Sequence, residues 1–194
     1  MKNEGIFLPF DCESGGIGDE VSLLTVHFAV CDEDWNVLDE LDLKTKPKDV
    51  DETGSTLYKV TASALNINHI DLIKHNAEAI PYNEAGGKLR DFLIRNSRDG
   101  AIKLQPMGKN IGGDVAWVTN HLLGKKTFEK YVSYRHYDIT TAVTFLKRTG
   151  KLDRFAPESL EKLAEYFGIK AQWHTARGDN YAGIEVMKKL ESLA

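Results

Sequence analysis

Two acidic residues, Asp11 and Glu13, flank Cys12 directly after the first apolar run of the chain, residues 6–10. This run is predicted to be a buried strand that ends at Asp11. Residues two apart in a strand point to the same face, so both carboxylates can bind one metal ion while Cys12 points to the opposite, buried side. Hard divalent cations such as Mg²⁺ prefer oxygen ligands of this kind. An isolated Asp-x-Glu is usually a solvated strand end, so this pair alone does not establish a metal site.

A third acidic residue, Asp114, follows the stretch Asn-Ile-Gly-Gly at residues 110–113. This stretch lies between a predicted strand, residues 102–107, and a helix predicted to run from about residue 113 to residue 123. Its glycines would let the backbone pass close to a neighbour or a ligand. An acidic residue in the first turn of a helix also suits the helix dipole, so metal ligation and helix capping explain Asp114 equally well when it is taken alone.

A histidine and a fourth acidic residue, His174 and Asp179, lie in the last quarter of the chain. The last helix is predicted to begin near Asp179, which would place its carboxylate in the first turn and His174 on the segment that leads into the helix. An imidazole titrates near neutrality, so His174 could accept a proton from a water molecule. A loop histidine followed by a helix-capping aspartate is the ordinary alternative. The other five histidines have no comparable partners in the sequence and are predicted to be structural; they are His27, His69, His75, His121 and His136.

The elements that must position these residues follow from the hydrophobic pattern. Three strands, then alternating helices and strands, then helices, predict an α/β sheet with helices on its faces. Pro9 cannot donate to a sheet ladder, so a bulge or an unpaired amide is expected there. The predicted strands are residues 6–10, 21–31, 37–43, 102–107 and 131–137. The predicted helices are residues 61–65, 81–96, 113–123, 139–148 and 157–167, and a last one from residue 179.

The size and charge of the chain limit its class. A chain of 194 residues is expected to form one domain, residues 1–194, with a core that needs no disulfides. Neither a signal peptide nor an apolar run long enough to cross a membrane is visible, and the two cysteines are predicted to be buried free thiols, so a cytoplasmic location is expected. The net charge of −4 disfavours tight binding of duplex nucleic acid, although bound cations would offset four of the acidic groups.

Together, the motifs resemble the DEDD-type 3′→5′ exonucleases, specifically the branch with histidine in the third motif, which includes the DnaQ-like proteins, ribonuclease T and oligoribonuclease. His174, Ala176, Asp179 and Ala182 match its pattern His-x-Ala-x-x-Asp-x-x-Ala, and residues 159–169 are similar to its usual approach to that motif. Residues 108–114 and 134–141 resemble oligoribonuclease in particular. The likeness extends from residue 6 to the last helix and is weakest over residues 44–101. Ser14 departs from the threonine that is usual in the family.

This resemblance implies a ribonuclease H-like α/β fold, a mixed five-stranded sheet flanked by helices. It also implies two divalent cations, Mg²⁺ or Mn²⁺, and His174 as a general base. The metal ligands implied are Asp11, Glu13, Asp114 and Asp179, which with His174 form the catalytic set. The expected contacts to the terminal nucleotide are Ser14, Gly15 and Asn110.

The activity that the resemblance implies is release of nucleoside 5′-monophosphates from the 3′ end of single-stranded nucleic acid, with RNA slightly favoured over DNA. One alternative is a proofreading or repair exonuclease that acts on single-stranded DNA. Another is a nucleic-acid-binding module that kept the fold and lost catalysis, and the presence of all five catalytic residue types counts against it. No membrane partner is expected. The sequence leaves the oligomeric state open, a homodimer included.

Overall fold

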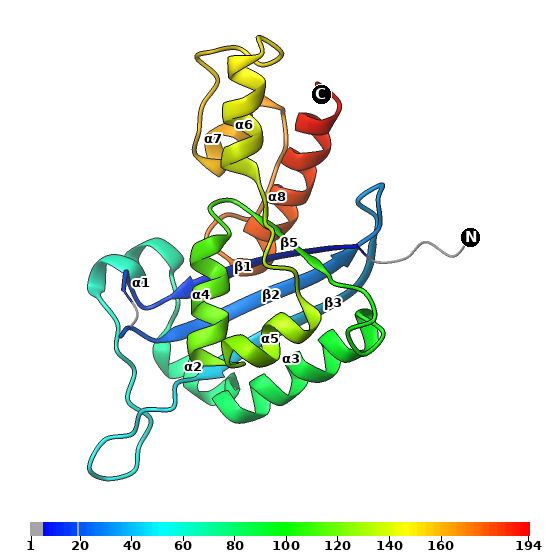
Figure 1. Ribbon diagram of the computed structural model, residues 1–194. Helices are drawn as coiled ribbons and strands as arrows, with labels where there is room; N and C mark the ends of the chain where they lie inside the picture. Colours follow the sequence, from blue (N-terminus) through cyan, green and yellow to red (C-terminus); the bar gives the residue numbers. More distant parts are fainter. Residues whose placement is uncertain (1–5, 19) are drawn as a thin grey trace.

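A mixed β-sheet forms the centre of the molecule (Figure 1). The computed structural model describes residues 6–18 and 20–194, and in this part of the chain six strands follow the order β4-β3-β2-β1-β5-β6. Neighbours β1, β2 and β3 are antiparallel, whereas β5 runs parallel to β1, β6 parallel to β5, and β4 parallel to β3. The strands are β1 (Phe7–Ser14), β2 (Leu23–Cys31), β3 (Val37–Lys46), β4 (Ile80–Pro81), β5 (Gln105–Gly108) and β6 (Tyr137–Asp138).

The α/β class is confirmed, but the predicted number of five strands is wrong. The two-residue strand β4, directly before a helix, adds the sixth. The strand predicted at residues 131–137 is mostly absent. Tyr131 ends helix α5, Val132 makes a single isolated bridge with Leu104, and only the last residue, Tyr137, belongs to β6. Phe128 and Tyr131 are both buried, and their spacing of three residues suits one face of a helix better than one face of a strand.

Eight helices surround the sheet in the described part of the chain. The helices predicted at residues 81–96, 113–123 and 139–148 are confirmed to within two residues, and that capped by Thr61 extends three residues further than predicted. Two short helices, α2 and α5, were not predicted, and Pro157 lies before its helix rather than in it. The helices are α1 (Ala62–Asn68), α2 (Leu72–Glu78), α3 (Tyr82–Asn96), α4 (Gly112–His121), α5 (Lys125–Tyr131), α6 (Ile139–Arg148), α7 (Leu160–Tyr166) and α8 (Ala176–Glu191). None of them is long and apolar enough to cross a membrane.

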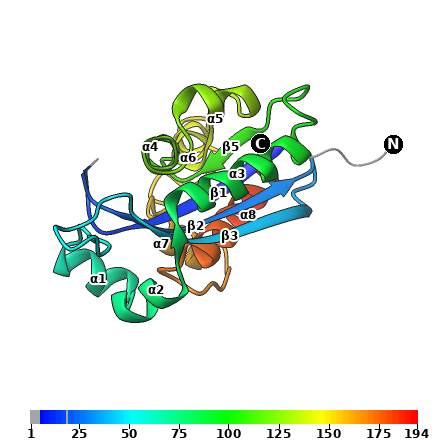
Figure 2. The same ribbon diagram turned by 90° about the horizontal axis from the view of Figure 1, so that it is seen from below.

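The two faces of the sheet carry different helices (Figures 1 and 2). Leu8 and Phe10 of β1 belong to a core with residues of α3, α4 and α5, and Cys12 packs against the same core. Helix α8 crosses the opposite face, and its second half packs with α6 and α7 in a second core. Because side chains alternate along a strand, Asp11 and Glu13 point to the face that α8 covers. The predicted opposition of Cys12 to the two carboxylates is therefore confirmed.

Strand β1 has an irregular end but no bulge at Pro9. Its register with β2 is the same before and after Pro9: Phe7 pairs with Cys31, and pairing resumes at Phe10 with Phe28. The register shift falls later, between Glu13 and Ser14. The missing N–H of Pro9 thus opens the ladder locally without inserting a residue.

Candidate active site: an acidic cluster at the end of strand β1

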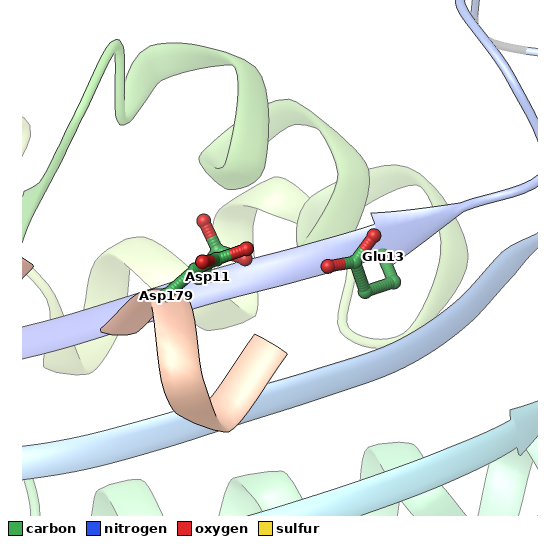
Figure 3. Close-up of side chains that lie close together, drawn as sticks. All are labelled: Asp11, Glu13 and Asp179. Atoms are coloured by element: carbon green, nitrogen blue, oxygen red, sulfur yellow. The ribbon is translucent and has the colours of Figure 1, made fainter. Parts of the chain in front are cut away.

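Three carboxylates meet where β1 ends beneath the first turn of α8 (Figure 3). Asp11 and Glu13 come from the strand, and Asp179 comes from the helix. Each offers an oxygen atom, and these atoms all lie within 4.8 Å of one another. The structure thus brings together three of the four acidic residues that the sequence singled out as metal ligands.

The fourth acidic residue, Asp114, lies in the first turn of α4, next to this group but not within it. Its Oδ1 accepts a hydrogen bond of 3.0 Å from the backbone N–H of Cys12. Strand β5 pairs with β1 only as far as Pro9, so Cys12 lies beyond the paired stretch and its amide can donate to Asp114. Asp114 nevertheless interacts electrostatically with the cluster: its negative charge raises the pKa of Asp11.

Burial raises the pKa of all four carboxyls, and the charges of neighbouring carboxylates in the group raise it further for Asp11 and Glu13. Burial is the largest cause for each, and it raises the pKa of Glu13 and of Asp114 to about 7 and the pKa of Asp179 to about 6. The pKa of Asp11 is raised well above its usual range, by burial and then by the charges of the other three. The neighbouring imidazole and backbone of His174 act in the opposite direction on the pKa of Asp179. A divalent cation would remove this repulsion, and carboxylate oxygens suit Mg²⁺ or Mn²⁺, so the residues fit such an ion.

His174 lies on the segment that leads into α8, close enough to Asp179 to affect its charge. Its backbone is left-handed, with φ of 60°. Its ring lies edge-on to the ring of His69: the ring centroids are 6.4 Å apart and the ring planes are nearly perpendicular. His69 was predicted to be structural, since nothing in its spacing along the chain connects the end of α1 with the motif around His174. The structure adds this second imidazole to the site.

A tight turn fixes the start of α8 and hence the place of Asp179. The helix begins at Ala176, three residues before the predicted start, because Thr175 is the N-cap and its Oγ1 accepts a bond of 3.1 Å from the N–H of Gly178. The same hydroxyl donates to the carbonyl oxygen of Gln172 at 3.0 Å. A Cβ atom on Gly178 would lie 1.8 Å from that carbonyl oxygen. Only glycine therefore fits directly before Asp179.

The expected nucleotide contacts Ser14 and Gly15 form the loop just after the acidic strand. The Oγ of Ser14 donates to the carbonyl of Gly16 at 2.7 Å. The N–H of Gly15 donates to Ser22, and its carbonyl accepts from Thr61. Both backbone groups of Gly15 are thus engaged within the protein, which leaves the lone pairs of the Ser14 hydroxyl as the more accessible polar group.

The third expected contact, Asn110, lies on the loop before α4 with φ of 54°. Its Oδ1 accepts a hydrogen bond of 2.8 Å from Thr140 of α6. Asp138, the N-cap of α6, accepts a bond of 3.0 Å from the N–H of Ile111 in the same loop. These contacts hold the loop that precedes Asp114 against α6. The side chain of Asn110 therefore stabilises this loop by a hydrogen bond within the protein.

Two hollows meet at Glu13 and Asn68, which line both. The first, of about 490 Å³, extends over the loop after β1 and is bounded by the fully exposed Ile17 and by Ile67, which is 56% exposed. The second, of about 560 Å³, extends toward β3 and α2. Its other lining residues include His69, Lys44, Lys74, His174 and Arg177. The isoleucines carried no signal in the sequence, because an isolated apolar residue in a loop has no periodic partner.

No protein-family model matches this chain, and no curated protein matches it in sequence. Solved structures of E. coli exonuclease I are similar in fold. The complex with a 5cy-dA13 oligonucleotide is 17% identical with a TM-score of 0.71, and covers 97% of this chain and 41% of that one. The complex with the inhibitor BCBP is 16% identical with a TM-score of 0.73, over 98% and 42%. A zinc-bound complex with single-stranded DNA is 19% identical with a TM-score of 0.73, over 97% and 41%.

The chain thus spans about two fifths of the length of the exonuclease I chains that it matches. At these identities the likeness concerns the fold, and it confirms the predicted ribonuclease H-like α/β architecture. The acidic cluster and its neighbours are properties of this chain's own residues.

Proposed function

We propose that residues 1–194 form a single exonuclease domain that removes nucleoside 5′-monophosphates from the 3′ end of single-stranded nucleic acid. The observation that carries this proposal is the convergence of Asp11, Glu13 and Asp179 next to His174. These residues come from the first strand and the last helix of the chain. A fold shared with exonuclease I, which has been solved with bound oligonucleotides, supports the same conclusion.

Asp11, Glu13, Asp114 and Asp179 would hold two divalent cations, Mg²⁺ or Mn²⁺. Such cations make a water molecule a better nucleophile and stabilise the charge that develops on the leaving 3′ oxygen. The carboxylates supply the negative charge that would bind them. In the metal-free protein burial raises the pKa of these ligands, and the neighbouring carboxylates raise it further for Asp11 and Glu13. Asp114 would turn toward the cations while remaining next to the Cys12 amide.

His174 would accept the proton of the attacking water at a ring nitrogen. Its place before the N-cap of α8 lets the ring reach the edge of the acidic cluster without being buried in it. His69, whose ring meets that of His174, would limit the orientations that the base can adopt. A general base of this kind typically contributes about 10²–10⁴-fold to the rate.

The hollow beside Glu13 would take the terminal nucleotide. Its volume suits one nucleotide rather than a duplex, and Ile17 and Ile67 offer apolar surface to a base. Ser14 would contact the sugar or the phosphate through its hydroxyl. Gly15 would shape the loop, and Asn110 would act by holding the loop of Asp114.

RNA is the first candidate substrate, since residues 108–114 and 134–141 resemble oligoribonuclease. Single-stranded DNA is the second candidate, and a specific observation favours it: the solved structures with this fold include complexes with dA13 and dT13 oligonucleotides. Both candidates require an unpaired 3′ end, and the net charge of −4 agrees with weak binding of duplexes.

A degradation panel tests the proposal. RNA and DNA carrying a 5′ label would be incubated with the protein and Mg²⁺ or Mn²⁺, as dinucleotides, short strands, long strands and blunt duplexes. We expect ladders that shorten one nucleotide at a time, slow digestion of duplexes and inhibition by a 3′-phosphate. Faster loss of DNA than of RNA would select the second candidate. Cleavage of a closed circle would contradict exonuclease action altogether.

A further inference from the structure

A buried polar pair, His27 and Asn180, lies directly behind the acidic cluster. His27 pairs with Asp11 across strands β1 and β2, so its side chain points to the face that carries the cluster. Asn180 follows Asp179 in α8. His27 is fully buried and Asn180 is 4% exposed. Polar side chains at this depth are costly unless they are hydrogen-bonded, so their partners indicate what they do.

Asn180 joins α8 to both central strands through one amide group. Its Nδ2 lies 3.1 Å from the carbonyl oxygen of Pro9, 2.9 Å from Nδ1 of His27 and 3.2 Å from the carbonyl oxygen of His27. Two of these atoms are carbonyl oxygens, which can only accept, so the amide must present its NH₂ group to the sheet. Nδ1 of His27 then accepts as well, and the ring hydrogen resides on Nε2.

Pro9 explains why the sheet has room for this amide. Because proline has no N–H, the ladder between β1 and β2 lapses at this point, and the Pro9 carbonyl accepts its bond from the Asn180 side chain instead. A buried carbonyl without a partner would be destabilising. The side chain of α8 therefore fills a gap that the proline opens in the strand two residues before Asp11.

Further bonds hold the same turn of α8 from the solvent side. Glu40 of β3 accepts a bond of 2.7 Å from Arg177 and one of 2.6 Å from the hydroxyl of Tyr181. Nε2 of His27 lies 3.5 Å from Glu40. Asp179 thus lies within a helical turn that is attached to the sheet on both sides.

We propose that Asn180, supported by His27 and the Pro9 carbonyl, is a positioning residue that sets the depth and rotation of the first turn of α8 and thereby aims the carboxylate of Asp179 at Asp11 and Glu13. This inference rests on the proposed metal-dependent function. Partners that orient metal ligands typically change metal affinity by about 10–100-fold when they are removed. The amide of Asn180 is bonded to Pro9 and His27 and does not belong to the carboxylate group, so it would act through Asp179.

The test measures Mn²⁺ binding to the whole chain without substrate, by titration calorimetry, together with the melting temperature of the metal-free protein. Asn180→Ala removes all three bonds, and Asn180→Ser is a milder change that keeps one donor. Val186→Ala is the control, because Val186 is fully buried in the same helix but packs in the second core. We expect Asn180→Ala to weaken Mn²⁺ binding about 10–100-fold and Asn180→Ser to weaken it less. Val186→Ala should lower the melting temperature and leave Mn²⁺ affinity within twofold of wild type.

Equal Mn²⁺ affinity in Asn180→Ala and wild type, at a lowered melting temperature, would show that Asn180 only stabilises the fold and would overturn this inference alone. If Asn180→Ala does not fold, the same comparison made with Asn180→Ser decides. A wild-type protein that binds no Mn²⁺ would instead contradict the proposed function. Amide exchange of residues 176–179 in the metal-free protein gives a second readout: it should speed up in the Asn180 variants and not in Val186→Ala.

Discussion

Asp11 of the first strand and Asp179 of the last helix place carboxylate oxygens within 4.8 Å of each other. Burial raises the pKa of both, and the charge of Asp179 raises the pKa of Asp11 further. In the metal-free protein the two carboxyls therefore resist being ionised at the same time. Its persistence in the fold is understandable if the two carboxylates are normally bridged by positive charge.

The metal-free protein should lose stability as the pH rises from about 4 to about 7. Glu13 and Asp114 have pKa values raised to about 7 from ordinary values of 4.5 and 3.8, and the pKa of Asp179 is raised to about 6. A carboxyl with a higher pKa in the folded state binds more protons when folded, so the free energy of unfolding falls through this window. Asp11, whose pKa is raised well above its usual range, adds to the fall. Melting temperatures measured across this range in EDTA test the expectation, and Mg²⁺ should restore the stability lost at pH 7.

Asp11→Asn should raise the melting temperature of the metal-free protein at pH 7 by a few degrees, because it removes a carboxyl whose ionisation is opposed by burial and by the three neighbouring carboxylates. It should also abolish the stabilisation by Mg²⁺. Glu33→Gln is the control, since Glu33 is exposed in the turn between β2 and β3, at the other end of the sheet. A lowered melting temperature of Asp11→Asn, or the same Mg²⁺ response as wild type, would argue against a charge cluster.

Gly178→Ala should disrupt the start of α8. A methyl group there would collide with the carbonyl of Gln172, so the turn that carries His174 and Asp179 has to move. We expect a destabilisation of about 1–3 kcal/mol, measured by urea unfolding, together with weaker Mn²⁺ binding. The matched variant Gly87→Ala, at a helical position with nothing within 4 Å of the new Cβ, should be stabilised by about 0.5–1 kcal/mol instead. Similar effects of the two substitutions would show that the close contact at Gly178 does not constrain the motif.

His174→Ala should reduce kcat by about 10²–10⁴-fold while substrate affinity stays close to that of wild type, as expected for loss of a general base. His69→Ala should reduce kcat far less, since His69 contacts the His174 ring rather than the acidic cluster. Single-turnover rates and substrate binding in Ca²⁺ separate the two effects. A larger loss of kcat in His69→Ala than in His174→Ala would indicate that His69, rather than His174, is the general base.

Ile17→Ala should raise KM severalfold and leave kcat and the melting temperature nearly unchanged. Ile17 is fully exposed, so its removal costs the fold little, whereas a base packed against it would lose apolar contact. Ile73→Ala, which removes another highly exposed isoleucine on α2, serves as the control. An unchanged KM in Ile17→Ala would place the terminal base elsewhere.

The sequence predicted those parts of the site that depend on local spacing. The pair Asp11 and Glu13 follows from the two-residue period of a strand, and it lies on one face as predicted. The start of α8 could not be predicted from the sequence, because it depends on the contact of Thr175 and Gly178 with the carbonyl of Gln172. The turn that these residues form becomes apparent only when the chain is folded.

Contacts between distant segments account for the other differences. His69 meets His174, and Asn180 fills the gap left by Pro9, although no spacing in the chain relates the partners. Tyr131, predicted to begin a strand, instead ends helix α5, and β6 begins only at Tyr137. The burial of Phe128 with Tyr131 decides between helix and strand only in three dimensions. The architecture is thus predictable from periodicity and resemblance, whereas these contacts are not.

The most direct test of the proposed activity compares wild type with Asp179→Asn on a single strand that carries a 5′ label. We expect wild type with Mg²⁺ to produce a ladder that shortens from the 3′ end, EDTA to stop the reaction, and Asp179→Asn to be almost inactive with Mg²⁺ although it remains folded. Full activity in EDTA or in Asp179→Asn, or release of the labelled mononucleotide as the first product from long strands, would contradict a metal-dependent 3′→5′ exonuclease.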